Sequence, residues 1–268
     1  MSNSEQPVSV QGRFDLRRGA GGYAPIIGAL GALAVPGIVV LFTVPAKHSH
    51  YDTQLIALAA GLLIIAVIGS LISSISLASI AAERELTANI PGAIMQIAVP
   101  AAISIIDILA AFEVLAAVYL PLSKTLFALI AGAGGACCAF FTAFTVGDSW
   151  YAGPKNPDDR EKYIRRPWWA DTHKKAYKNA NKVTLTSLPP IILGMLLRGL
   201  QITVPVSDFS IEFMIWTGLV FSIAGAIAGN RRMYHDPSGI QIPLQPWEAY
   251  GTTIVIGGYV FVLMLLLP

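Results

Sequence analysis

Seven long apolar runs alternate with polar segments along the chain. Each run has enough residues to cross most or all of the roughly 30 Å of hydrocarbon in a bilayer as a helix, which rises about 1.5 Å per residue. The pattern predicts an all-α fold, a polytopic integral membrane bundle with about seven transmembrane helices. The runs cover residues 24–44, 55–81, 93–120, 125–146, 183–204, 210–229 and 251–267.

The basic residues predict the orientation of this bundle. Nine of the eighteen Lys and Arg residues lie within 155–182, and three more precede the first apolar run. Because cytoplasmic loops are enriched in Lys and Arg, we expect both segments inside the cell and the C-terminus outside. The chain then divides into a cytoplasmic N-terminal segment, 1–23, and one transmembrane domain, 24–268, with a basic cytoplasmic loop at 147–182.

Composition supports the bilayer as the main solvent. Hydrophobic residues make up 54% of the chain and charged residues 13%, whereas roughly 25% of an ordinary soluble domain is charged. The basic residues gather in a few loops, which favours lipid headgroups over nucleic acid as the anionic partner. We expect no nucleic-acid partner and a multi-pass location in the cell (plasma) membrane. Cys137 and Cys138 are neighbours in an apolar run, so they provide no disulfide framework.

Motifs of the common enzyme classes are missing from the sequence. It has no Gly-x-Ser-x-Gly, His-Glu-x-x-His or Cys-x-x-Cys, and no phosphate-binding glycine loop followed by Lys. All four histidines fall between the apolar runs and no lysine lies inside one, which argues against a bis-histidine haem and a retinal Schiff base. The sequence identifies no cofactor. It favours a non-enzymatic role, with an intramembrane enzyme as a third hypothesis.

The third apolar run carries the buried carboxylates. Asp107 lies near its middle, and Glu113 lies about 9 Å further along the helix. Ionisable groups at such depth are costly and usually mark ion paths, proton relays or salt bridges. Pro100 cannot donate a hydrogen bond to the carbonyl of Gln96, which leaves an acceptor one turn before Ser104. We predict a proton or cation site formed by Asp107 and Ser104; the alternative is a protonated Asp107 bonded to a neighbouring helix.

Arg198 is predicted to lie inside the fifth span. It comes six residues before the end of its run, and Glu113 comes seven before the end of its own. The two depths therefore match within about 2 Å at 1.5 Å per residue, which predicts a salt bridge inside the bundle. Arg198 has other options, because it could extend to the outer headgroups or pair with Asp208 or Glu212.

Basic and aromatic residues are combined in the cytoplasmic loop. Arg165 and Arg166 are followed closely by Trp168 and Trp169. Tryptophan prefers the headgroup layer and arginine prefers anionic lipid, so we predict a lipid-headgroup anchor. Docking of a regulatory partner is the alternative.

The outer loop after the first run holds three potential metal ligands, His48, His50 and Asp52. Extended backbone would put all three on one face, and their side chains suit zinc or copper. The alternative is a polar turn at the membrane interface.

Small residues recur at every fourth position of the fourth run, a spacing that lets helix backbones approach closely. This run is therefore expected to be a buried central helix, or a contact with a second copy of the chain or another subunit. The two rows are Ala128, Gly132 and Ala136, and Ala131, Gly135, Ala139 and Ala143.

Two functions remain open at this point. The buried carboxylates favour translocation of a small solute or an ion, with Asp107 as a protonatable or cation-binding site. The small number of polar residues in the spans favours the alternative, a non-catalytic accessory or scaffold subunit of a larger membrane complex. A water-filled path to Asp107 would favour transport, and a solid core with an exposed groove of small residues would favour a subunit.

Overall fold

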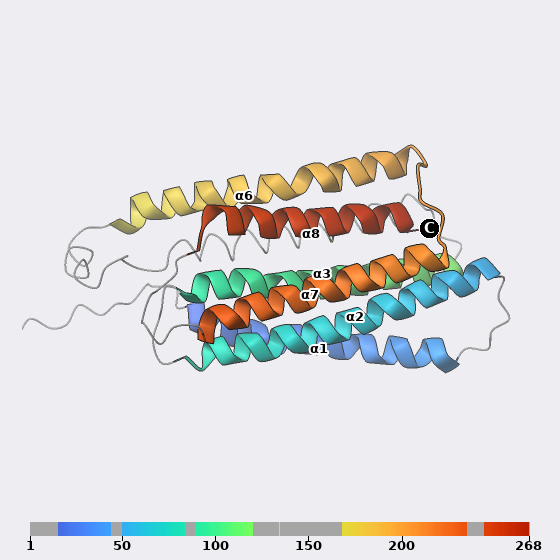
Figure 1. Cartoon of the computed structure of the whole chain (residues 1–268), viewed down its shortest axis with the longest axis horizontal. Helices are drawn as coiled ribbons and strands as arrows, with labels where there is room; N and C mark the ends of the chain where they lie inside the picture. Colours follow the sequence, from blue (N-terminus) through green and yellow to red (C-terminus); the bar gives the residue numbers. More distant parts are fainter. Residues whose placement is uncertain are drawn as a thin grey trace, which may run out of the picture.

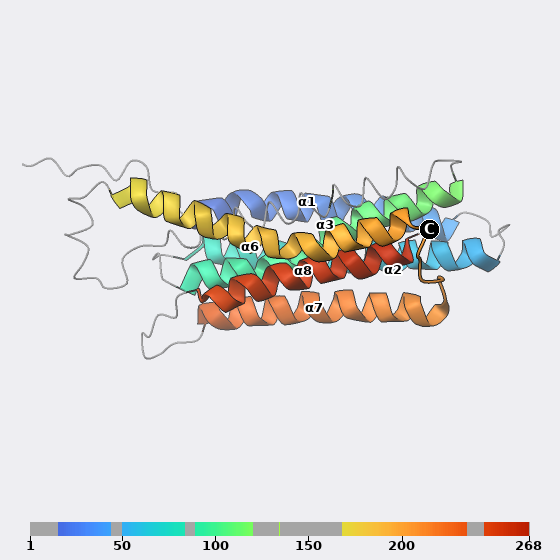
Figure 2. The ribbon, with the colours of Figure 1, turned by 90° about the horizontal axis from the view of Figure 1, so that it is seen from above.

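The computed structural model describes residues 16–43, 50–83, 89–119, 134, 168–234 and 244–267. Within these residues the regular elements are all α-helices, and Figures 1 and 2 show them aligned in one elongated bundle. The six helices are α1 (Leu16–Thr43), α2 (His50–Ala81), α3 (Asn89–Tyr119), α6 (Trp168–Gly199), α7 (Asp208–Tyr234) and α8 (Pro246–Leu266).

Five of the described helices, α1, α2, α3, α7 and α8, are long and apolar enough to cross a membrane. The all-helical, membrane-type fold is therefore confirmed in outline. Helix α6, whose first half carries lysines, is not among the five. The predicted fourth run lies outside the described residues except for Gly134. The count of seven spans and the orientation stay predictions.

The ends of two helices differ from the predicted spans. Helix α1 already begins at Leu16, inside the N-terminal segment 1–23 that was predicted to precede the first span. Helix α6 ends at Gly199, before the predicted end at residue 204. Gln201 follows this end in the left-handed conformation that glycine usually takes at a helix C-cap, with a φ of 60°. The N–H of Ile202 donates to the carbonyl of Leu197 at 2.9 Å. This backbone capping closes the helix although the sequence stays apolar beyond it.

Four of the described helices run in one direction. Figure 1 shows that α1, α3, α6 and α8 begin at one end of the bundle, whereas α2 and α7 begin at the other. Helix α3 therefore ends at the end of the bundle that is opposite to the start of α6. In both views α6 and α8 lie side by side.

The core lies between α2, α3 and α8, where side chains such as Leu62, Ile103 and Ile256 are 0% exposed. The outside of the bundle is also apolar. On α7, for example, Phe209 is 78% exposed and Trp216 is 63% exposed. A surface with many such side chains is costly in water and suits contact with lipid.

Candidate functional site

Asp107 is fully buried in the middle of α3 and accepts a hydrogen bond from α8. The donor is the hydroxyl of Tyr259, whose Oη lies 2.7 Å from Asp107 Oδ1. The exposed fraction is 0% for Asp107 and 2% for Tyr259. Gly218 of α7 leaves room for the phenol, because a Cβ at this position would lie 2.8 Å from Tyr259 Oη. Three helices thus enclose the pair.

The second carboxylate oxygen of Asp107, Oδ2, lacks the kind of hydrogen bond that Oδ1 accepts. Oδ2 is buried, and no described residue donates a hydrogen bond to it. Buried polar atoms in native proteins nearly always have a partner, and an exception is often explained by an ion, a water or a functional proton. Oδ2 is therefore the atom of this site that is available to a ligand.

Ser104 lies one turn before Asp107 on α3 and is also 0% exposed. Its hydroxyl donates to the carbonyl oxygen of Pro100 at 2.7 Å. The acceptor predicted from the sequence was the carbonyl of Gln96, but that oxygen faces Gly225 of α7, where a Cβ would lie only 2.8 Å away. The Gln96 carbonyl thus lies where α3 packs closely against α7, and Ser104 uses the carbonyl of Pro100, one turn further along the helix.

Glu113 is 3% exposed near the end of α3, and neither of its carboxylate oxygens accepts a hydrogen bond from the described residues. The positive charge of Arg198 lies close enough to act on this carboxylate. The salt bridge itself stays a prediction.

Sequence reasoning missed a second polar cluster where α3, α7 and α8 meet at the end from which α3 begins. Arg232 Nη1 lies 2.5 Å from Glu248 Oε1, with the side chains only 7% and 10% exposed. Gln96 Nε2 is 3.4 Å from the same oxygen, a long contact. The guanidinium covers Gly92, where a Cβ would lie 2.3 Å from its central carbon. The acidic Glu248 in the first turn of α8 was a signal for a basic partner, but the sequence alone did not identify Arg232.

The described residues contain no group of three or more His, Cys, Asp and Glu side chains that could hold a metal ion. Compared with protein-family models, curated proteins and solved structures, the chain matches none of them. Function must therefore be inferred from the geometry of the buried polar residues.

The predicted outer-loop metal site depends on residues at the start of α2. His50 and Asp52 belong to this helix, which begins at His50. The extended backbone assumed for the site is therefore absent at these two residues. His48 lies outside the described residues, so the site stays a prediction without its geometric basis.

The structure describes only two of the four residues of the predicted headgroup anchor. Trp168 and Trp169 form the beginning of α6, and Arg165 and Arg166 lie outside the described residues.

Both rows of small residues in the fourth run also lie outside the described residues. The described residue of that run, Gly134, is buried, and a Cβ there would lie 2.5 Å from Leu109 Cδ1 of α3.

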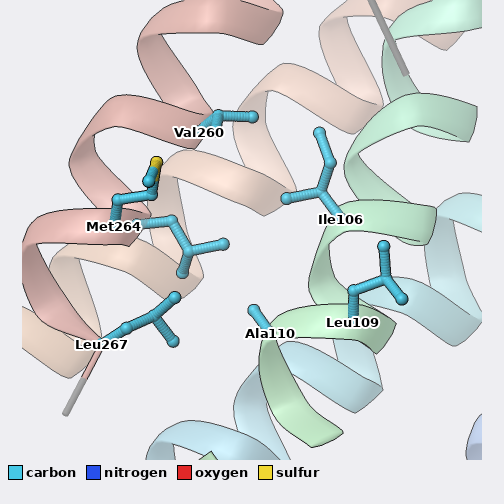
Figure 3. Close-up of a pocket in the computed structure, with 7 residues that line it drawn as sticks. Ile106, Leu109, Ala110, Val260, Met264 and Leu267 are labelled. Carbon is cyan, nitrogen blue, oxygen red and sulfur yellow. The ribbon is translucent and has the colours of Figure 1, made fainter. Parts of the chain in front are cut away.

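An apolar recess lies between α3 and α8 beside the Asp107–Tyr259 pair. Figure 3 shows Ile106 and Ala110 of α3 facing Val260 and Met264 of α8 across it. Its lining residues are all apolar, so it offers no polar side chain to an ion. The recess is thus separate from the candidate site.

Proposed function

We propose that this chain translocates a proton or a small monovalent cation across the membrane and that Asp107 binds it. One observation carries the proposal: Asp107 is 0% exposed, yet its Oδ2 atom has no hydrogen-bond donor among the described residues. A bare carboxylate in a medium of low dielectric constant is costly, so the group needs either a proton or a cation.

Tyr259 gives this carboxyl a defined orientation. Its hydroxyl holds Oδ1 at 2.7 Å, so Oδ2 has a fixed position at which a proton or cation can be bound and released. Exchange of one for the other keeps the site neutral. A neutral, buried site avoids the cost of moving a bare charge through hydrocarbon, which suits a carrier.

The test is flux through the purified chain in liposomes, followed with an internal pH dye and with radioactive sodium. Wild type should exceed protein-free liposomes for at least one of the two ions. Asp107→Asn should reduce this flux to background, because Asn can still accept the Tyr259 hydrogen bond but cannot ionise. Asp208→Asn is the matched control, since Asp208 is exposed at the start of α7. Equal flux by Asp107→Asn and wild type would refute the proposal.

An accessory subunit is the second candidate, favoured by how completely the Asp107–Tyr259 pair is enclosed. In that case the pair only joins helices, and the isolated chain conducts nothing. Purification from its native membrane followed by mass spectrometry would then recover stoichiometric partner subunits. A chain purified alone that also shows Asp107-dependent flux excludes this candidate.

A further inference from the structure

Three oxygen atoms from α3 and α7 converge on one glycine of α2. A Cβ at Gly69 would lie 2.4 Å from Ser104 Oγ, 3.1 Å from the carbonyl oxygen of Pro100 and 3.5 Å from Ser222 Oγ. Because Gly69 has no side chain, these oxygens can gather against its backbone in the small space between the three helices.

One of these three oxygens, and one oxygen of the nearby Asp107, lack a hydrogen-bond partner among the described residues. Ser222 Oγ, on α7, is buried without one, and so is Asp107 Oδ2. Ser222 and Asp107 are each 0% exposed. Ser104 donates its proton to Pro100, but a hydroxyl oxygen keeps lone pairs that can bind a cation. These oxygen atoms therefore have unused lone pairs that could bind a positive ion.

The helix geometry brings Asp107 next to the same space. Ser104 and Asp107 are three residues apart on α3, so they share a face. Ser222 is one turn from Gly218, which touches the Tyr259 hydroxyl that binds Asp107. Ser104 thus lies about one helical turn, roughly 5 Å, from Asp107, and Ser222 lies one turn along α7 from the glycine that contacts the Asp107–Tyr259 pair.

We propose that this space binds one sodium ion, coordinated by Asp107 Oδ2, the hydroxyl oxygens of Ser104 and Ser222, and the carbonyl oxygen of Pro100. Ligands that are all oxygen suit a hard cation. A single carboxylate balances a single positive charge, whereas a divalent ion would leave a net charge in the core. As sodium binds, the proton on Asp107 leaves, so the site exchanges one H⁺ for one Na⁺ and stays neutral.

The inference rests on the proposed function and names sodium as the ion, so the experiment measures binding apart from flux. Purified full-length chain in detergent is titrated with radioactive sodium, with choline as the background salt. Wild type should bind one sodium ion per chain. Ser222→Ala should weaken binding about tenfold or more, because one ligand to a charged group is lost. Ser222→Cys should do the same, since sulfur is a poor ligand for a hard cation, and it guards against a packing defect.

Ser70→Ala is the matched control. Ser70 is likewise buried without a hydrogen-bond partner among the described residues, but it packs against α1, where a Cβ at Gly31 would lie 2.5 Å from Ser70 Cβ. This variant should bind sodium as wild type does. An equal loss in Ser70→Ala and Ser222→Ala would overturn the site.

The outcomes separate the site from the function. Wild type that moves protons through Asp107 but binds no sodium overturns the sodium site and leaves the proposed function intact. Sodium binding that is unchanged in both Ser222 variants also overturns the site, and a water then fills the space. If the wild type shows neither sodium binding nor flux, both proposals are overturned.

Discussion

Asp107 and Tyr259 join α3 and α8 in the same register as a second pair of residues, Gln96 and Glu248. The two residues are 152 positions apart in the sequence, and so are Gln96 and Glu248, which meet at the end of the bundle where both helices begin. A constant separation at two levels means that α3 and α8 run parallel without a change of register. A shift of α8 along α3 would therefore break both contacts together.

The Asp107–Tyr259 hydrogen bond should show measurable coupling. Tyr259→Phe and Asp107→Asn should each destabilise the chain, and a double-mutant cycle should give a coupling free energy of about 0.5–2 kcal/mol, the range for hydrogen bonds between membrane helices. Unfolding in mixed micelles measures it. The control is Tyr250→Phe on the same helix, which should show no coupling to Asp107. Additive losses for Tyr259 and Asp107 would contradict the pairing.

The Arg232–Glu248 ion pair should hold α7 and α8 together. Arg232→Gln or Glu248→Gln leaves the other charge without its partner and should cost about 1–3 kcal/mol of unfolding free energy, less than a fully buried pair because water reaches both groups. The double variant should recover part of this loss. Arg231→Gln, at an exposed neighbour, should change stability little. Equal effects at Arg231 and Arg232 would show that the ion pair adds nothing.

Two adjacent glycines of α8 should respond in opposite ways to alanine. At Gly257 a Cβ would lie 2.6 Å from the backbone carbonyl oxygen of Ser187 on α6, so Gly257→Ala should cost about 1–3 kcal/mol by overpacking. At Gly258 no described atom lies within 4 Å, so Gly258→Ala should be neutral or stabilise by up to about 1 kcal/mol through helix propensity. Thermal unfolding of both variants tests this. Equal stability of the two would mean that α6 does not pack closely on α8.

Much of the helical architecture could be predicted from the sequence. A run such as 55–81 is long and without charged residues, and a helix can satisfy all of its backbone groups in lipid. Helix ends were predicted less well for two reasons. They depend on backbone capping, as at Gln201, and polar residues can continue a helix, as Arg17 and Arg18 do at the start of α1. The metal hypothesis for His50 and Asp52 assumed extended backbone, and the helix start removed that basis.

The place of Asp107 inside a long apolar helix was also predictable, but its partner was not. Many residues of other spans share that depth, and the rotation of α8 against α3 decides which of them faces Asp107. Tyr259 therefore emerged only from the packed helices. The same holds for Ser222, which is one of several serines in the apolar runs and is distinguished only by its position opposite Gly69.

The predicted Glu113–Arg198 pair can be tested by charge exchange. Glu113→Gln and Arg198→Gln should each lower the yield of folded protein, and the double variant should recover part of the loss, because removing one partner strands the other charge. The exchanged pair, Glu113→Arg with Arg198→Glu, should also be better tolerated than either half. Gel filtration of the detergent extract measures all of these. No recovery in either double variant would mean that the two residues act separately.

The most direct test of the account is whether the carboxyl of Asp107 changes its charge when the site is loaded. Infrared difference spectra of the chain in lipid membranes should be recorded while sodium concentration and pH are raised in turn. The account predicts that the band of a protonated carboxyl is lost and a carboxylate band appears, and that both changes are absent in Asp107→Asn. Spectra that do not change with sodium or pH, or changes that persist in Asp107→Asn, would contradict it.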